Sequence, residues 1–146
     1  MKKVYQTRFG KPKGNCILAC IASVLEVELS EVPDILADNE KWWEIINNWA
    51  KPYGYILMPV EFKDYKDTPP CYCILGGKGE NGIPHAVVGF GAECVHDPHE
   101  GWNGLKDDEI SECTLFISID PARQKIGTTT AIPDDVQGHH QMANNH

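Results

Sequence analysis

The sequence predicts an α+β fold in which N-terminal helices pack on one face of a small antiparallel sheet. Between about residues 16 and 51, apolar side chains recur with the 3.6-residue period of helices. After Pro52 they come in short runs bounded by glycine and proline, which is typical of strands. Helices that come first and strands that follow indicate a sheet with its helices gathered on one side.

The first helix is predicted over about residues 16–26. Cys16, Cys20 and Val24 begin an apolar stripe at four-residue spacing, and apolar neighbours widen it. We therefore expect this helix to be buried on more than one side. Asn15 directly precedes it and is the residue type that caps a helix N-terminus well.

A second helix is predicted from about Asn39 to Lys51, with Asp38 or Asn39 as its cap and Pro52 ending it. Its apolar face follows the i, i+3, i+4, i+7 pattern and consists of Trp42, Ile45, Ile46 and Trp49.

Five strands are predicted after the helices, and a polar connection over 63–70 separates the first two. The third and fourth strands flank Gly91-Ala92 and are expected to form a hairpin. The loop Gly76–Pro84 contains four glycines, so we expect it to be mobile and to gate access to His85. The predicted strands cover 55–60, 71–75, 86–90, 93–96 and 114–119.

Length and composition limit the domain organisation and the partners. The chain has 146 residues, which predicts one domain at roughly 150 residues per domain. We place that domain at 1–120 and expect 121–146, rich in polar residues, to be a poorly packed tail. A net charge of −8 argues against nucleic acid as a partner.

The apolar segments are too short for a membrane or for export. A membrane span needs about 20 consecutive apolar residues, and the longest run, Cys16–Leu25, has about half that length. Basic residues precede this run, as in a secretory signal, and Ile17-Leu18-Ala19-Cys20 loosely resembles a lipoprotein cleavage box. The apolar stretch before that cysteine is too short for a signal. We therefore expect a cytoplasmic protein with no membrane partner, in which the six cysteines are thiols.

The first candidate site residue is Cys16, at the start of the first predicted helix. A helix N-terminus offers free amide donors and about half a positive charge. Both favour thiolate over thiol. The simpler interpretation, a small apolar residue of the stripe, suits Cys20 better because Cys20 lies inside the helix.

The second and third candidates are His85 and Asp97. His85 stands at the mouth of an apolar strand, and Asp97 ends the next strand in His96-Asp97-Pro98-His99. In the expected hairpin, residues around 96–97 lie across from residues around 85–87. Asp97 is thus expected within hydrogen-bond reach of His85, where it orients the imidazole and stabilises its charged form. His96 should then point away from the site.

The chain resembles the papain-like cysteine peptidase superfamily, most of all the bacteriocin-processing (double-glycine leader) peptidases and their small phage and bacterial relatives. The resemblance spans about residues 4–119. It rests on one order of residues: Gln6, then Gly14-Asn15-Cys16, then His85-Ala86-Val87-Val88, then Asp97-Pro98. Asn15 stands where the processing peptidases usually have aspartate.

The resemblance implies a papain-like fold and a thiol-dependent hydrolase that cleaves a peptide, isopeptide or related amide. It implies Cys16 as the nucleophile, His85 as the general base and acid, and Asp97 as the residue that orients His85. It also implies Gln6 as an oxyanion donor beside the Cys16 amide, where the residue alone suggests a solvated glutamine. The expected partner is a peptide or protein substrate, and no cofactor is needed.

Two other functions compete with this one. Cys71, Cys73, Cys94 and His96, with His99 close by, offer soft ligands for a structural zinc site. The alternative is that Cys71 and Cys73 are core residues. A papain-like fold can also serve as a protein-binding effector without turnover, for which a groove lined by some of the four tryptophans is a candidate surface. The helical spacing of Trp42 and Trp49 instead favours places in the core.

Overall fold

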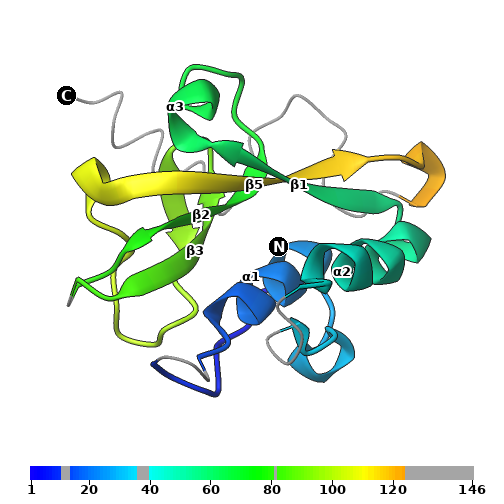
Figure 1. Ribbon diagram of the computed structural model, residues 1–146, viewed down its shortest axis with the longest axis horizontal. Coiled ribbons are helices and arrows are strands. Elements are labelled where there is room, and N and C mark those ends of the chain that lie inside the picture. The colour runs from blue at the N-terminus through cyan, green and yellow to red at the C-terminus, as the bar shows by residue number, and fades with distance from the viewer. Residues whose placement is uncertain (11–13, 36–39, 81, 124–146) are drawn as a thin grey trace.

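The computed structural model describes residues 1–10, 14–35, 40–80 and 82–123. Three α-helices and five strands make up about half of this part, and short 3-10 turns lie between some of them (Figure 1). The elements in chain order are α1 (Cys16–Leu25), η1 (Leu29–Glu31), α2 (Trp42–Ala50), η3 (Lys51–Tyr53), β1 (Tyr55–Glu61), α3 (Phe62–Tyr65), β2 (Tyr72–Lys78), β3 (Pro84–Phe90), β4 (Glu93–His96), η4 (Asp107–Glu109), β5 (Ile110–Ser118) and η5 (Pro121–Arg123).

The strands form one sheet in the order β1-β5-β2-β3-β4, and every neighbouring pair is antiparallel. The last strand in sequence therefore lies between the first two. The predicted hairpin of the third and fourth strands is confirmed, with Val88 opposite His96 and Phe90 opposite Glu93. The α+β class and the small antiparallel sheet are thus as the sequence predicts.

The two predicted helices, α1 and α2, share one face of the sheet, as expected, and a short helix that was not predicted, α3, lies on the other face. Side chains of α1 and α2 pack with Tyr72, Ile74 and Val88 in the larger core. The alternate residues of the same strands, Cys73 and Leu75 among them, face the other way and pack under Tyr65 of α3. Figure 1 shows α3 on the opposite side of the strands from α1 and α2.

The short helix α3 occupies the stretch predicted as a polar connection. Its four residues are too few for a helical period to be visible in the sequence. Tyr65 nevertheless is buried, and its hydroxyl donates to the carbonyl of Cys71 at 3.1 Å. This one aromatic residue covers the second face of the sheet.

The predicted first helix is confirmed, but Asn15 does not cap it. All residues from Leu18 to Leu25 are buried, as the wide apolar stripe predicts. The Asn15 side chain makes no capping hydrogen bond and instead turns toward the N-terminal segment. The second helix begins only at Trp42, with Lys41 at its N-cap position, and Asp38 and Asn39 lie outside the described residues.

The predicted strands are extended in two places that matter for the site. Strand β2 continues through Gly76 and Gly77, and β3 begins at Pro84, so that His85 lies within the strand and opposite Gly77. The expected mobile loop is therefore wrong for 76–78, which belong to the sheet. A Cβ atom at Gly77 would collide with the backbone of Glu109, so glycine lets the chain before β5 approach this closely.

Strand β5 also begins earlier than predicted, at Ile110 rather than 114. The predicted poorly packed tail is described only at Pro121–Arg123, and the rest of it lies outside the described residues. In the part of the chain that the structure covers, none of the helices combines the length and the apolar character needed to cross a membrane.

Candidate active site

Cys16 is the first residue of α1 and is half-buried. The backbone N–H groups in the first turn of a helix have no partner within the helix, so the Cys16 amide is free to donate to a bound group. A Cβ atom at Gly14 would lie 2.7 Å from the carbonyl oxygen of Gly10. Glycine at position 14 thus allows this close approach just ahead of Asn15 and Cys16.

His85 comes to Cys16 from the strand that packs on α1. It is the second residue of β3, and α1 lies against β2 and β3 (Figure 1). On one side the imidazole faces the Cys16 thiol, which lines the same cavity and helps to raise the pKa of His85. On the other side its Nε2 lies 2.7 Å from Oδ1 of Asp97. Because Nε2 faces the carboxylate, Nδ1 is the nitrogen left for the thiol.

Asp97 follows β4 and its carboxylate is held by three groups. Oδ1 accepts from His85 and from the backbone N–H of His99 at 2.8 Å, and Oδ2 accepts from the N–H of Gly104 at 2.9 Å. Its side chain and that of His85 are each 4% exposed. The expectation that Asp97 lies within hydrogen-bond reach of His85 is confirmed.

The electrostatics of the pair favour an ion pair. Burial lowers the pKa of His85, but the hydrogen bonds to Asp97 and Cys16 outweigh it and raise that pKa to about 9. Burial likewise raises the pKa of Asp97. The hydrogen bonds from His85, His99 and Gly104 outweigh that effect, and the pKa falls below its ordinary value. At neutral pH the imidazole is therefore charged and the carboxylate ionised.

Gln6 reaches the same place from the N-terminal segment. Its backbone N–H donates to the carbonyl of Pro98 at 2.9 Å, which ties it to the turn after Asp97. The side chain is buried, its Nε2 donates to the carbonyl of Arg8 at 3.0 Å, and its Oε1 has no partner among the described residues. One N–H of the amide remains free to donate, which is the requirement for an oxyanion donor.

A cavity of about 390 Å³ joins these residues. Its polar members are Gln6, Cys16 and His85, and its apolar and aromatic walls include Phe9, Ile17, Ile83, His99 and Trp102. A small set of polar groups in a largely apolar hollow is typical of a binding site for a small molecule or a side chain. The three sequence-predicted residues Gln6, Cys16 and His85 thus line one cavity, and Asp97 lies directly behind His85.

Two features of the site have no counterpart in the predictions. The first is a ring stack, in which His99 lies parallel to Trp102 with centroids 3.8 Å apart and planes 6° apart. Trp102 also meets His85 edge-on at 5.1 Å. The stack covers the outer side of the imidazole. The one signal for this stack in the sequence is that His99 and Trp102 follow closely after Asp97-Pro98 along the chain.

The second feature is the side chain of Asn15. Its Oδ1 accepts from the N–H groups of Thr7 and Arg8, at 3.0 and 2.9 Å, and its Nδ2 donates to the Thr7 hydroxyl. The backbone N–H of Asn15 also donates to the carbonyl of Arg8, the group that Gln6 holds. Asn15 therefore fixes the Gln6 segment beside the residue that follows it, Cys16.

His96 points away from the site, as predicted. Its Nε2 lies 2.7 Å from the carbonyl oxygen of Val4, and its ring packs edge-on against Tyr5. Burial lowers the pKa of His96, so it is neutral at pH 7. Its neutral Nε2–H donates to the carbonyl of Val4.

The other cysteines lie in different surroundings. Burial raises the pKa of Cys20 and raises that of Cys94 to about 11, and the hydrogen bond with Cys113 helps to raise that of Cys73. All six cysteines are free thiols. Within the described ranges, His, Cys, Asp and Glu form no group of three or more that could hold a metal ion. Cys73 is a core residue, whereas Cys71 is exposed.

Known proteins give no further guide to this site. The chain matches no protein-family model, no curated protein and no solved structure.

Proposed function

We propose that this protein is a thiol-dependent hydrolase, a papain-like cysteine peptidase or amidase. The observation that carries the proposal is that His85 lines one cavity with the Cys16 thiol and is held from behind by Asp97 at 2.7 Å. A nucleophile, a base within hydrogen-bond reach and a third group that orients the base form the arrangement of acyl-transfer enzymes.

The first half of the reaction makes an acyl-enzyme. His85 holds the Cys16 proton as the imidazolium of an ion pair, and the thiolate attacks the carbonyl carbon of a peptide or related amide to form a C–S bond. The tetrahedral intermediate collapses as the C–N bond breaks, and the His85 imidazolium gives its proton to the leaving amine.

The second half of the reaction hydrolyses the acyl-enzyme. Water attacks the thioester with His85 as base, and the carboxylic acid and the free thiol are released.

An oxyanion hole for the intermediate is proposed from two donors. The Cys16 backbone N–H is free in the first turn of α1, and Gln6 has one uncommitted amide N–H in the same cavity. Pre-positioned donors at the developing negative charge are worth about 10²–10³ in turnover for each donor. Gln6→Ala should therefore lower kcat strongly, and Gln6→Glu, which removes the donor, should do the same.

The papain-like fold is part of the proposal. In support, the nucleophile opens a buried helix that packs against a sheet, and the base comes from a strand of that sheet. The free thiols suit a reducing compartment, for which we propose the cytoplasm. A peptide or protein substrate suits a site that lies in an accessible cavity lined by apolar and aromatic groups.

Thiol labelling tests the proposal directly. The folded protein is treated at neutral pH with limiting iodoacetamide or with an epoxide of the E-64 type, and the modified cysteine is located by mass spectrometry. Wild type should be labelled at Cys16, and should hydrolyse members of a mixed peptide library that Cys16→Ala leaves intact. Earlier alkylation of Cys94 or Cys113 would refute the nucleophile assignment. Labelling without hydrolysis of any amide would indicate a binding module.

A further inference from the structure

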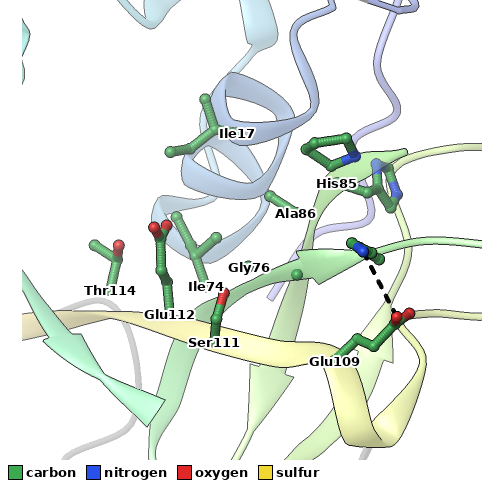
Figure 2. A pocket seen from close by; sticks show the side chains of 12 residues that line it. Ile17, Ile74, Gly76, His85, Ala86, Glu109, Ser111, Glu112 and Thr114 are labelled. Atoms are coloured by element: carbon green, nitrogen blue, oxygen red, sulfur yellow. Dashed lines mark ion pairs between the residues drawn. The ribbon is translucent and has the colours of Figure 1, made fainter. Parts of the chain in front are cut away.

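A second cavity, of about 480 Å³, lies on the β5 side of His85. It shares Ile17, Pro84 and His85 with the first cavity, so the two hollows meet at the catalytic pair. A substrate whose cleaved bond lies at Cys16 can therefore place a neighbouring side chain in this second cavity. Figure 2 shows it between the side of α1 that carries Ile17 and the strands β2 and β5.

Two glycines of β2 leave the space open. Gly76 pairs with Glu112 across the sheet, and a Cβ atom at Gly76 would meet the Glu112 side chain at 3.4 Å. The ladder shifts register between Gly76 and Gly77, where the backbone before β5 comes close. A side chain at Gly76 would lie against Glu112 in the lining, and Gly77 has no room for a side chain. The glycines that the sequence suggested as a mobile loop thus shape a wall of the site.

The lining has two chemical parts. Ile17, Ile74 and Ala86 form an apolar wall next to His85, and farther along β5 come Ser111, Thr114 and the carboxylate of Glu112. In Figure 2, Glu112 extends from β5 beside Ile74, toward the helix that carries Ile17. An apolar entrance that leads to a carboxylate and two hydroxyls matches a long aliphatic chain with a cationic end.

Glu112 is a charged side chain of this lining that has no counter-charge beside it. The other acid of the lining, Glu109, is 3.7 Å from Lys78 and 3.9 Å from Lys106. The side-chain carboxylate of Glu112 has no ion pair or hydrogen bond in the part of the chain that the structure describes. The positive groups of the lining are Lys78 and His85, and the negative ones are Glu109 and Glu112. Lys78 pairs with Glu109 and His85 pairs with Asp97, so Glu112 is left without a counter-charge.

From this geometry we infer that the second cavity is a specificity pocket for a lysine or arginine side chain of the substrate, with Glu112 as its counter-charge. The inference rests on the proposed hydrolase function and adds the substrate class. The cavity adjoins His85 directly, so the basic residue is the first or the second one from the cleaved bond. Its aliphatic stem packs on Ile17 and Ile74, and its cationic end reaches Glu112.

Peptidyl chloromethyl ketones test the inference without knowledge of the natural substrate. Six probes carry lysine, norleucine or glutamate at the first or the second residue from the reactive carbon. The rate constant for alkylation of Cys16 is measured for each by mass spectrometry. In one of the two positions, lysine should react roughly three- to tenfold faster than norleucine, as expected for a partly exposed ion pair, and glutamate should be slowest.

Two variants of Glu112 distinguish a direct contact between its carboxylate and the probe from a general effect of negative charge near the cavity. Glu112→Gln should bring the lysine and norleucine rates together, and Glu112→Lys should make glutamate the preferred residue. The matched control is Glu61→Gln, because Glu61 stands opposite Glu112 on β1 but does not line the cavity. This control removes the same charge and should keep the lysine preference.

Failure of this inference is distinguishable from failure of the proposed function. If iodoacetamide does not label Cys16 selectively in the wild type, the proposed function fails. If Cys16 is labelled selectively but lysine and norleucine probes react equally in both positions, only the specificity pocket fails. A lysine preference that Glu61→Gln abolishes as strongly as Glu112→Gln would also overturn the assignment to Glu112.

Discussion

Each face of the sheet holds a cysteine beside a polar side chain, but the two thiols differ in their chemistry. On the α1 face, the half-buried Cys16 lies beside His85, whose charge Asp97 stabilises. On the α3 face, Cys73 contacts Cys113 and Tyr65 in an apolar cluster without a formal charge.

The difference lies in the partners as well as in burial, since Cys16 is half-buried and Cys73 fully buried. The Tyr65 hydroxyl near Cys73 has a pKa raised above its ordinary value by burial, so it is a poor base at neutral pH. His85 is buried as well, yet its pKa is raised because a carboxylate with three hydrogen bonds lies behind it. A buried thiol becomes a nucleophile when a charge network reaches it, and remains a small apolar residue where none does.

Replacement of one cysteine on each face by alanine tests this comparison, and it gives the largest expected effect. Cys16→Ala removes the nucleophile, so peptide hydrolysis should fall by about a thousandfold or more. Cys113→Ala should leave kcat/KM within about threefold and lower the free energy of unfolding by about 1 kcal/mol, since it only truncates a core side chain. Steady-state kinetics and urea unfolding measure the two effects. Equal loss of activity in both variants would remove the functional distinction between the faces.

Asp97→Asn weakens the charge network and leaves the thiol in place. An amide offers the imidazole no compensating charge, so turnover should fall by about a hundredfold or more while the fold persists. The pKa of His85 should fall below its wild-type value of about 9. NMR titration of the imidazole measures this shift. His96→Ala is the control. His96 hydrogen-bonds to the carbonyl of Val4, away from the site, so this variant should keep its activity. If His96→Ala abolished turnover and Asp97→Asn did not, the assignment of Asp97 would be wrong.

The charged pair also predicts how stability depends on pH. The pKa of His85 is raised from about 6.5 to about 9 on folding. Its contribution to stability is therefore complete below pH 6.5 and is lost as the pH rises through about 9. The free energy of unfolding should fall over this window by about 3 kcal/mol at most. Urea unfolding between pH 6 and pH 10 measures it, and His85→Gln should lack the fall. The kcat/KM profile should decline over the same range as the imidazolium is lost.

The sequence predicted the parts of this site that depend on local pattern. A cysteine at a helix start is visible in Cys16, and a hairpin that brings Asp97 to His85 follows from two short strands around Gly91-Ala92. The course of β2 through Gly76 and Gly77 was not predictable, because glycine is usually a strand breaker. Here the neighbouring backbone approaches too closely for any side chain at Gly77.

The hydrogen-bond partners of individual side chains also could not be predicted from the sequence. Asn15 precedes a helix, and in isolation it is a good cap. The segment at Thr7 and Arg8 offers it two backbone N–H groups and a hydroxyl, and it bonds there instead. The first-turn N–H groups of α1 therefore receive no bond from the Asn15 side chain. A residue expected to stabilise the helix thus connects two parts of the site.

Substitution of Asn15 gives the smallest effect and tests that connection. Asn15→Ala removes both acceptor bonds to the Gln6 segment, so Gln6 should lose its fixed position beside Cys16. We expect kcat to fall by roughly tenfold with little change in KM, because the oxyanion donor acts in the transition state rather than in substrate binding. Iodoacetamide labelling of Cys16, which forms no oxyanion, should keep its wild-type rate. Asn15→Asp retains the oxygen that accepts from Thr7 and Arg8 and should recover most of the activity. If Asn15→Asp were as slow as Asn15→Ala, the acceptor bonds would not be what positions Gln6.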